Sequence, residues 1–298
     1  KIYHQYQISY HVLIYLFCIL IIGLPIMMAE IMIGRSSQKS PVNAMRLSAE
    51  KSNQSPSWRF VGWGGLISGL LILSFYSVLA GICLDYIFIS GTDSGGMSTT
   101  EKFASQTASV SKLLFWHTAF ILMNIIIIGA GVVSGIERIV RLLMPMLFVL
   151  MIVMVVNSII NGDFARGLSF LFAPNFSDVT PATFLSAMGQ AFFSLSLGMG
   201  SIMCYGAYMP KDENVFNTSL TVCGLDTLIA IMAGLAIFPI IFAYGLEPDA
   251  GPSLVFISLL SVFWDMPFGN YIGPVFFILL SVAALSLSLI HISEPTRL

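Results

Sequence analysis

The sequence predicts an all-α membrane protein, and three observations carry this prediction. Of the 298 residues, 57% are hydrophobic and only 9% are charged, whereas a soluble domain has about 25% charged residues. The charged residues lie mostly between long apolar runs. One of these runs, at about 183–209, is rich in glycine and serine at its middle, which predicts a discontinuous helix.

Seven apolar runs are long enough to cross a bilayer as helices, which requires about 20 residues each. The predicted spans are about 12–34, 64–90, 113–134, 139–161, 183–209, 217–245 and 271–290. The cationic residues between them alternate in number from one interval to the next. Eight lie in one set of intervals and three in the other: Arg35, Lys39, Arg46, Lys51, Arg59, Arg138, Arg141 and Lys211 against Lys102, Lys112 and Arg166. The positive-inside rule therefore predicts that the first span runs from outside to inside.

The fifth run, at about 183–209, carries the strongest functional signal. Its middle reads SLSLGMGS from Ser194 to Ser201. Non-helical backbone survives within a membrane only where protein or an aqueous cavity satisfies its polar groups. An interrupted span is therefore a candidate site for a substrate and ions. The alternative is a close helix–helix contact made by small residues.

Three acidic residues lie within or at the edge of the predicted spans: Glu30, Asp85 and Asp226. A carboxylate at mid-bilayer costs about 2.5–3.5 kcal/mol on insertion scales, so it usually faces a partner, a cavity or an ion. Asp226 is the deepest, and it could meet Ser194 at an alkali-cation site, because carboxylates and hydroxyls are hard oxygen ligands. A hydrogen bond to a neighbouring helix is the alternative. For Glu30 we expect a structural bond to exposed backbone.

Other classes of function have little support in the sequence. The cysteines, Cys18, Cys83, Cys204 and Cys223, lie in apolar surroundings without CxxC spacing, so we expect buried small side chains rather than a metal site or disulfides. The four histidines form no ligand cluster, and no nucleotide loop, nucleophile elbow or HExxH motif is present. A net charge of −2 gives no indication of nucleic-acid binding.

The two ends of the chain differ from the rest. Residues 1–11 start without Met, do not resemble a signal peptide and do not continue smoothly into the first span. Residues 287–298 begin with the string LSLIHISEPTR, which resembles a translated sequencing-library adapter. A genuine polar tail is the alternative. We therefore expect a transporter-like domain at 12–286, incomplete and with about seven spans, in a gene fragment.

Five motifs resemble the sodium-coupled neurotransmitter and amino-acid symporter family. In order they are GLPIMMAEIMIGR, SGIERIVRLLMP, AMGQAFFSLSLGMGSIMCYGAYMPKDENV, LDTLIAIMAGLAIFP and AGPSLVFISLLSVFWDMPFGNYIGPVFF. The resemblance covers about 12–286 and identifies a bacterial-type member of the family. It implies a partial inverted-repeat fold of the bacterial leucine transporter type, in which the seven spans are helices two to eight. It also implies sodium-driven import of an amino acid by alternating access.

The resemblance assigns roles to individual residues. The matching substrate-binding positions are Ile72, Tyr76, Phe193, Ser194, Ser196 and Met199. The matching sodium positions are Ser194, Asp226, Ala283 and Ser286. Tyr76 matches a tyrosine that bonds the substrate carboxylate, and Phe193 matches an aromatic lid. Gln190 and Tyr205 also fall in the motif, where we expect structural roles.

The resemblance and the side chains together predict a substrate class. Ile72, Phe193 and Met199 would form an apolar wall, and methionine adapts to several shapes, so we expect a hydrophobic or aromatic amino acid. Family members that need chloride use the anion to offset sodium charge near the position of Asp226. A fixed carboxylate there predicts that chloride is not required. The family's first helix is absent from the chain, so we expect the fragment itself to be inactive.

A channel and an intramembrane enzyme are the alternatives to symport. A channel would need a continuous polar path, whereas most of these spans are apolar almost throughout. An intramembrane enzyme would need paired carboxylates or a Ser/His pair at mid-depth, and none is evident. The short outer loop at 91–112 has no N-x-S/T acceptor, which favours a multi-pass protein of a prokaryotic inner membrane. The partners expected are the amino acid, sodium and lipid, with no nucleic acid; the sequence leaves the oligomeric state open.

Overall fold

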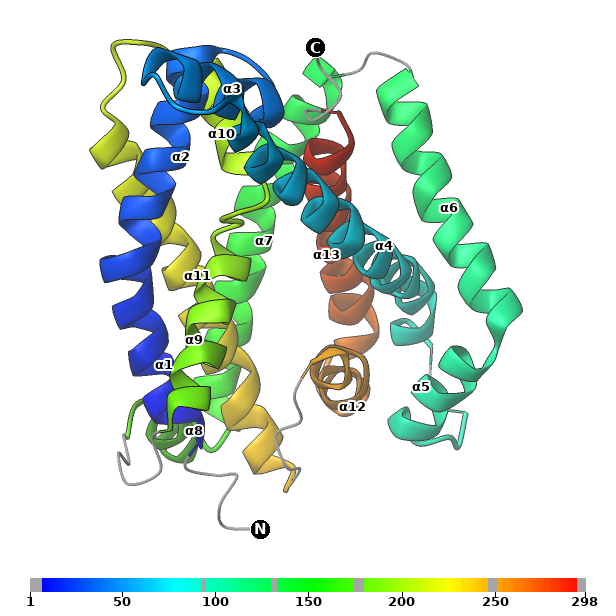
Figure 1. The fold of residues 1–298 in the computed structure, drawn as a ribbon. Helices are drawn as coiled ribbons and strands as arrows, with labels where there is room; N and C mark the ends of the chain where they lie inside the picture. The colour runs from blue at the N-terminus through cyan, green and yellow to red at the C-terminus, as the bar shows by residue number, and fades with distance from the viewer. Residues whose placement is uncertain (1–6, 93–94, 130–132, 174–179, 246–250, 294–298) are drawn as a thin grey trace. The chain divides into compact units, whose positions relative to one another are not determined.

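Every element of regular structure in the described residues is helical (Figure 1). The structure is a computed structural model, and it describes residues 7–92, 95–129, 133–173, 180–245 and 251–293. By its internal packing the chain divides into two compact units, Lys1–Ile72 with Leu168–Ile231 and Ile290–Leu298, and Leu73–Gly167 with Met232–Leu289. The helices α4 (Arg59–Ser90), α8 (Phe164–Phe172) and α11 (Val215–Ala243) each contribute to both units.

The first unit is built around one long rod and one broken helix. The rod consists of α1 (Gln7–Cys18), the wide π-turn η1 (Ile19–Gly23) and α2 (Leu24–Ser37). The broken helix consists of α9 (Pro181–Ser194) and α10 (Ser201–Tyr208). In Figure 1, α9 runs beside α1, and α10 runs beside α2. The short helices α3 (Pro41–Lys51) and η2 (Pro56–Trp58) follow the rod and lead into α4.

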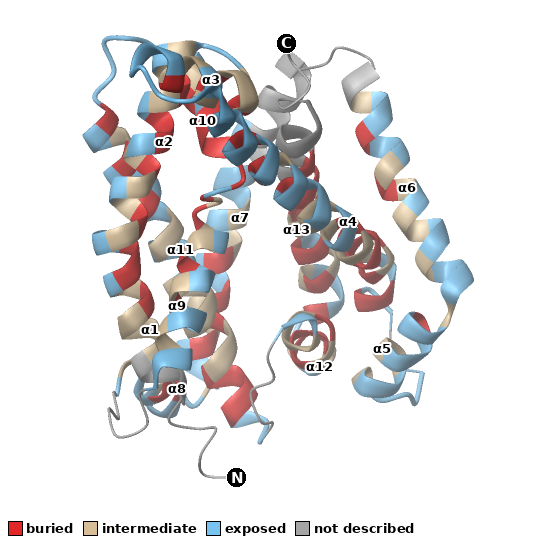
Figure 2. Cartoon of the chain, in the orientation of Figure 1, coloured by how far each residue is buried: buried red, intermediate tan, exposed pale blue. Residues whose placement is uncertain are grey.

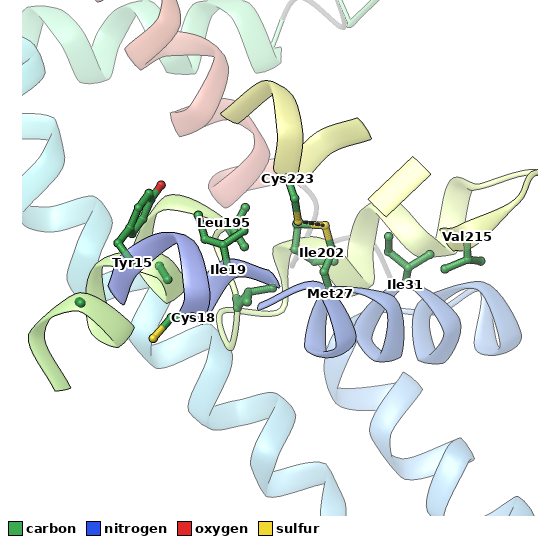
Figure 3. Packing of buried hydrophobic residues seen from close by; sticks show 12 residues of the cluster. Tyr15, Cys18, Ile19, Met27, Ile31, Leu195, Ile202, Val215 and Cys223 are labelled. Carbon is green, nitrogen blue, oxygen red and sulfur yellow. Dashed lines mark hydrogen bonds between the residues drawn. The ribbon is translucent and has the colours of Figure 1, made fainter. Parts of the chain in front are cut away.

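The core of this unit joins the rod, the broken helix and the first half of α11. One cluster of buried apolar side chains fills the space between these elements (Figure 3). Its members are Tyr15, Cys18, Ile19, Met27 and Ile31 of the rod, Ala187, Ala191, Leu195, Leu197 and Ile202 of the broken helix, and Val215 and Cys223 of α11. The thiol of Cys223 contacts the sulfur of Met27 at 3.8 Å. All of these side chains are buried, so van der Waals packing between the helices is the main stabilising contribution here.

The rod and α10 approach so closely that their crossing tolerates only glycine. A Cβ built on Gly34 would lie 1.9 Å from the carbonyl oxygen of Met203, and one built on Gly206 would lie 2.4 Å from that of Ile31. Glycines spaced in this way let the backbones of two membrane helices come into direct contact. The crossing fixes α10 against α2, the C-terminal half of the rod.

The second unit contains the rest of α4 and α11, the start of α8, and five further elements: α5 (Thr99–Ala108), α6 (Val110–Gly129), α7 (Val133–Asn161), η4 (Leu254–Ser258) and α12 (Leu259–Asp265). It also contains α13 (Gly269–Ser293) as far as Leu289. Its core is aromatic. Tyr86 lies edge-on to Phe256 at 4.9 Å between ring centroids, and Phe256 stacks on Phe103 at 5.8 Å. α6 exposes apolar side chains over most of its surface (Figure 2), as expected for a helix that faces lipid.

The predicted spans correspond to helices in the structure with small changes of boundary. Within the described residues, five helical segments are long and apolar enough to cross a membrane: His11–Ser37, Pro56–Ser90, Val110–Ile127, Met144–Asn161 and Val215–Ala243. The predicted span 183–209 is divided into α9 and α10, and the span 271–290 lies within α13. The last residues of the span 113–134 include 130–132, outside the described part.

The two predicted terminal segments fall partly outside the described residues. Residues 1–6 and 294–298 are not described. Of the remainder, Gln7–His11 forms the first turns of α1, and 287–293 continues α13.

Candidate functional site

The backbone between α9 and α10 leaves helical geometry from Leu195 to Gly200. Ser196, Gly198 and Gly200 have positive φ angles of 54°, 77° and 78°. This region is readily available to glycine, but for a residue with a Cβ it costs about 1–2 kcal/mol. The N–H groups of Ser196 and Leu197 bond back to the carbonyls of Phe193 and Phe192. The strained serine in this turn shows that the surrounding structure imposes the conformation.

Glu30 of α2 reaches the centre of this break. Its Oε1 accepts a hydrogen bond of 2.8 Å from the backbone N–H of Gly198. The Glu30 side chain is buried, and its Oε2 has no hydrogen-bond partner within the part of the chain that the structure describes. A carboxylate thus supplies the acceptor that the helix would otherwise have provided. The expectation that Glu30 bonds exposed backbone agrees with this contact.

Three polar side chains meet at the end of α9. The hydroxyl of Ser194 donates to Oδ2 of Asp226 on α11. The hydroxyl of Tyr15 on α1 donates to Oγ of Ser194 at 3.3 Å. Tyr15 is buried, whereas Ser194 and Asp226 are half-buried. The structure therefore brings Ser194 and Asp226 together, and it adds Tyr15 to them.

This arrangement can bind a cation through oxygen atoms. Ser194 is the last residue of α9, so the negative end of a helix dipole and the last helical carbonyls lie beside the carboxylate of Asp226. Hydroxyl, carbonyl and carboxylate oxygens are the ligands that hard cations prefer. The positive end of α10 begins at Ser201, where an anionic group of a ligand would be stabilised. The break therefore exposes hydrogen-bond acceptors at the end of α9 and backbone N–H donors at the start of α10.

The other predicted residues of the broken helix have distinct environments. Met199 is buried within the break, and the Ser196 carbonyl accepts a hydrogen bond of 3.1 Å from Oγ of Ser201. Phe193 lies on the last turn of α9 with 61% of its surface exposed. Gln190, one turn earlier, contacts Nε2 of His11 through its Oε1 at 2.9 Å, which is a contact between α9 and α1.

The remaining predicted residues lie on α4 and α13. Ile72 and Tyr76 are half-buried on α4. Tyr76 packs against the cluster of Ala80, Leu84, Phe120, Ala284 and Leu285, within the second unit. Ala283 is half-buried on α13. The backbone of Ser286 belongs to the same helix, but its side chain lies outside the described part of the structure.

Sequence reasoning missed Tyr15. This residue stands in a run of apolar and aromatic residues, HVLIYLFCIL, that offers no spacing signal for a polar role. Its position on the core face of α1 could be inferred from helical periodicity, but its partner 179 residues away could not. The cysteines Cys18, Cys83, Cys204 and Cys223 are all buried free thiols.

Comparison with known proteins identifies the family. The sequence profile of the Sodium:neurotransmitter symporter family matches residues 102–295, more than half of the chain. A sodium-dependent transporter of Haemophilus influenzae is 35% identical over 289 residues, which cover 94% of this chain and 63% of the relative. The sodium-dependent transporter YhdH of Bacillus subtilis is 34% identical over 290 residues, with 95% and 63% covered. The chain thus spans 63% of the length of these relatives.

A solved structure gives the same answer for the fold. The crystal structure of MhsT in complex with L-phenylalanine matches with a TM-score of 0.89 and 39% sequence identity, covering 98% of this chain and 66% of that one. The match confirms the predicted all-α fold of the bacterial leucine transporter type. Together with the apolar helices, it makes the chain a multi-pass integral membrane protein, and its bacterial relatives agree with the expected prokaryotic inner membrane. The chain belongs to the Sodium:neurotransmitter symporter family.

Proposed function

We propose that the protein is a sodium-driven symporter that imports a small hydrophobic or aromatic amino acid. The observation that carries the proposal is the break at Leu195–Gly200, which places helix ends of opposite polarity beside the Ser194–Asp226 pair. A zwitterionic substrate and a cation need this combination of donors and acceptors. The family supports sodium coupling, and the likeness to MhsT, whose structure holds L-phenylalanine, supports the substrate class.

Each site residue has a proposed role. Ser194 and Asp226 bind sodium, and Ala283 and Ser286 contribute to a second sodium site on α13. Tyr76 binds the substrate carboxylate, while Ser196 and Met199 shape the pocket for its side chain together with Ile72. Phe193 covers the substrate. Because Asp226 supplies a fixed negative charge beside the sodium, we propose that chloride is not required.

Uptake by proteoliposomes tests the proposal. The intact gene that encodes this chain is expressed, and the purified product is reconstituted and supplied with labelled phenylalanine, leucine, tryptophan or tyrosine. We expect saturable accumulation that needs an inward sodium gradient and disappears when an ionophore collapses it. Unsaturable flux would indicate a channel instead, and chemical conversion of the recovered label would indicate an enzyme.

The printed chain alone is proposed to be inactive. It covers 63% of the length of its curated relatives, and alternating access requires two complete repeats. Proteoliposomes that contain only the 298 residues should accumulate no more label than empty vesicles. Sodium-driven uptake by this chain would contradict the proposal of inactivity while supporting that of symport.

A further inference from the structure

The second half of α11 contains Pro239. Proline has no N–H, and its ring pushes away the carbonyl four residues earlier, which here belongs to Leu235. In a membrane such a carbonyl has no water to bind, so a neighbouring group must satisfy it. The question is which group does so.

Ser158 of α7 supplies this hydrogen bond. Its hydroxyl donates to the carbonyl oxygen of Leu235 at 2.7 Å, and the Ser158 side chain has no exposed surface. This is the most common donor–acceptor distance for a hydroxyl that donates to an oxygen. The hydroxyl therefore stands where the missing N–H of residue 239 would have acted.

The segment that follows α7 holds Pro239 itself. The backbone N–H of Asp163 donates to the carbonyl of Pro239 at 2.9 Å. Gly167 of α8 lies against the proline ring so closely that a Cβ built on it would be 2.4 Å from Cγ of Pro239. Oδ1 of Asp163 accepts from the N–H of Arg166 at 3.1 Å, which fixes the start of α8. Three contacts from the α7–α8 region thus converge on one turn of α11.

We propose that Ser158 is a positioning residue that replaces the hydrogen bond removed by Pro239 and thereby holds the second half of α11 in one conformation. The inference is independent of the proposed substrate and sodium sites, since none of the residues that make these contacts has a proposed role in those sites. It makes one distinctive prediction: the hydroxyl of Ser158 matters only while residue 239 is proline.

A double-mutant cycle tests this prediction directly. The intact gene product is prepared as wild type, Ser158→Ala, Pro239→Ala and the double variant, and melting is followed by tryptophan fluorescence in detergent. We expect Ser158→Ala to lower the melting temperature by roughly 3–6 °C in the wild-type background. In the Pro239→Ala background residue 239 has its own N–H, and the loss should fall below about 2 °C. Equal losses in both backgrounds would overturn the proposal.

A matched control is available on α4. Ser77 is also buried, with 2% exposed surface, but its hydroxyl donates to the carbonyl of Ser74 in its own helix at 3.1 Å. Ser77→Ala should change the melting temperature by less than about 1 °C, because that carbonyl is three residues earlier in an uninterrupted helix. If Ser158→Ala yields no folded protein, the double variant should restore folding. If neither variant folds, the proposed role of Ser158 is wrong.

Hydrogen exchange locates the effect. In Ser158→Ala the amides between Leu235 and Ala243 should exchange about tenfold faster than in the wild type, while those of α13 should keep their rates. A uniform acceleration over the whole protein, or no change in α11, would mean that Ser158 merely fills space.

Discussion

Glu30 and Gly198, 168 positions apart in the chain, are joined by a hydrogen bond of 2.8 Å from the Gly198 N–H to Oε1 of Glu30. This bond connects the rod to the centre of the broken helix. A charge-assisted bond of this kind contributes about 1.5–3 kcal/mol. The conformation proposed to bind sodium and substrate therefore depends on a residue that is not among the proposed ligands of either.

Two substitutions of Glu30 should distinguish the effect of its hydrogen bond to Gly198 from the effect of its negative charge. Glu30→Gln keeps a carbonyl oxygen as acceptor, so sodium-driven uptake should fall by less than about threefold. Glu30→Ala leaves the Gly198 N–H unpaired, and the apparent affinity for sodium should fall by about tenfold or more. Uptake measured over a series of sodium concentrations gives both the rate of uptake and the apparent affinity for sodium. Glu50→Ala is the control, since Glu50 is exposed and forms an ion pair with Arg46 at 3.7 Å, away from the break. Equal losses in Glu30→Gln and Glu30→Ala would refute the role of the bond.

Tyr15→Phe should weaken sodium binding modestly. The change removes the hydroxyl that donates to Ser194, and a neutral hydrogen bond is worth about 0.5–1.5 kcal/mol, or about 2- to 10-fold in affinity. The half-saturating sodium concentration for uptake measures this change. Tyr86→Phe is the matched control, because the buried Tyr86 hydroxyl has no partner among the described residues. A larger effect in Tyr86→Phe would count against the assignment.

Asp226→Asn should change the ions that transport requires. The amide keeps an oxygen beside Ser194 but removes the negative charge, so we expect about tenfold weaker apparent sodium affinity and a new stimulation by chloride. Uptake measured in sodium chloride and in sodium gluconate separates these effects. Asp163→Asn serves as control, since asparagine caps a helix as well as aspartate does. An unchanged ion dependence in Asp226→Asn would remove the proposed role of the carboxylate.

Gly34→Ala should disrupt the crossing of α2 and α10. The added methyl group would lie 1.9 Å from a backbone oxygen, so the helices must separate, and overpacking of this kind costs about 1–3 kcal/mol or more. The melting temperature should fall by several degrees. Gly224→Ala adds a methyl group that meets nothing within 4 Å, and it should be neutral or stabilising because alanine favours helix by about 1 kcal/mol. Similar behaviour of the two variants would contradict the described packing.

The first turn of α5 should become less stable at low pH. Hydrogen bonds from the backbone N–H and the hydroxyl of Ser98 hold the pKa of Glu101 below its usual value of 4.5. A carboxyl with a lowered pKa stabilises the folded state above its unfolded pKa and loses that contribution as the pH falls through the folded value. The start of α5 should therefore fray below about pH 4.5. Comparison of α5 protection in the wild type and Glu101→Gln, at pH 7 and pH 4, should show convergence in acid.

The sequence predicted the long elements because their signal is strong. Each span is an apolar run longer than 17 residues, and the run with Gly198 and Gly200 contains the residues that make an unwound backbone possible. The short helices α3, α5, α8 and α12 were not predicted, since seven to eleven residues of mixed polarity give too little periodicity. The π-turn η1 was also missed, because its residues Ile19–Gly23 look like any other part of an apolar helix.

The site was predicted in part. The acids within spans could be singled out because burial of a charge is costly, and the pairing of Ser194 with Asp226 follows from their positions on adjacent spans. The contact between Glu30 and Gly198 depends on two helices that meet across more than half of the sequence. The role of Tyr15 required the fold, since a tyrosine in an apolar run shows no preference for one partner.

The wide turn at Ile19–Gly23 sets the angle around the helix axis between Tyr15 and Glu30, two of the polar side chains through which the rod contacts the broken helix. Fifteen residues of regular α-helix would leave Tyr15 and Glu30 about 60° apart in azimuth, whereas the Leu24 N–H reaches back five residues to the Ile19 carbonyl, and this wider winding takes up part of that offset. Excising one residue from the turn would return it to regular α-helix, and the fourteen residues left between the two positions would set Tyr15 and Glu30 about 40° apart in azimuth.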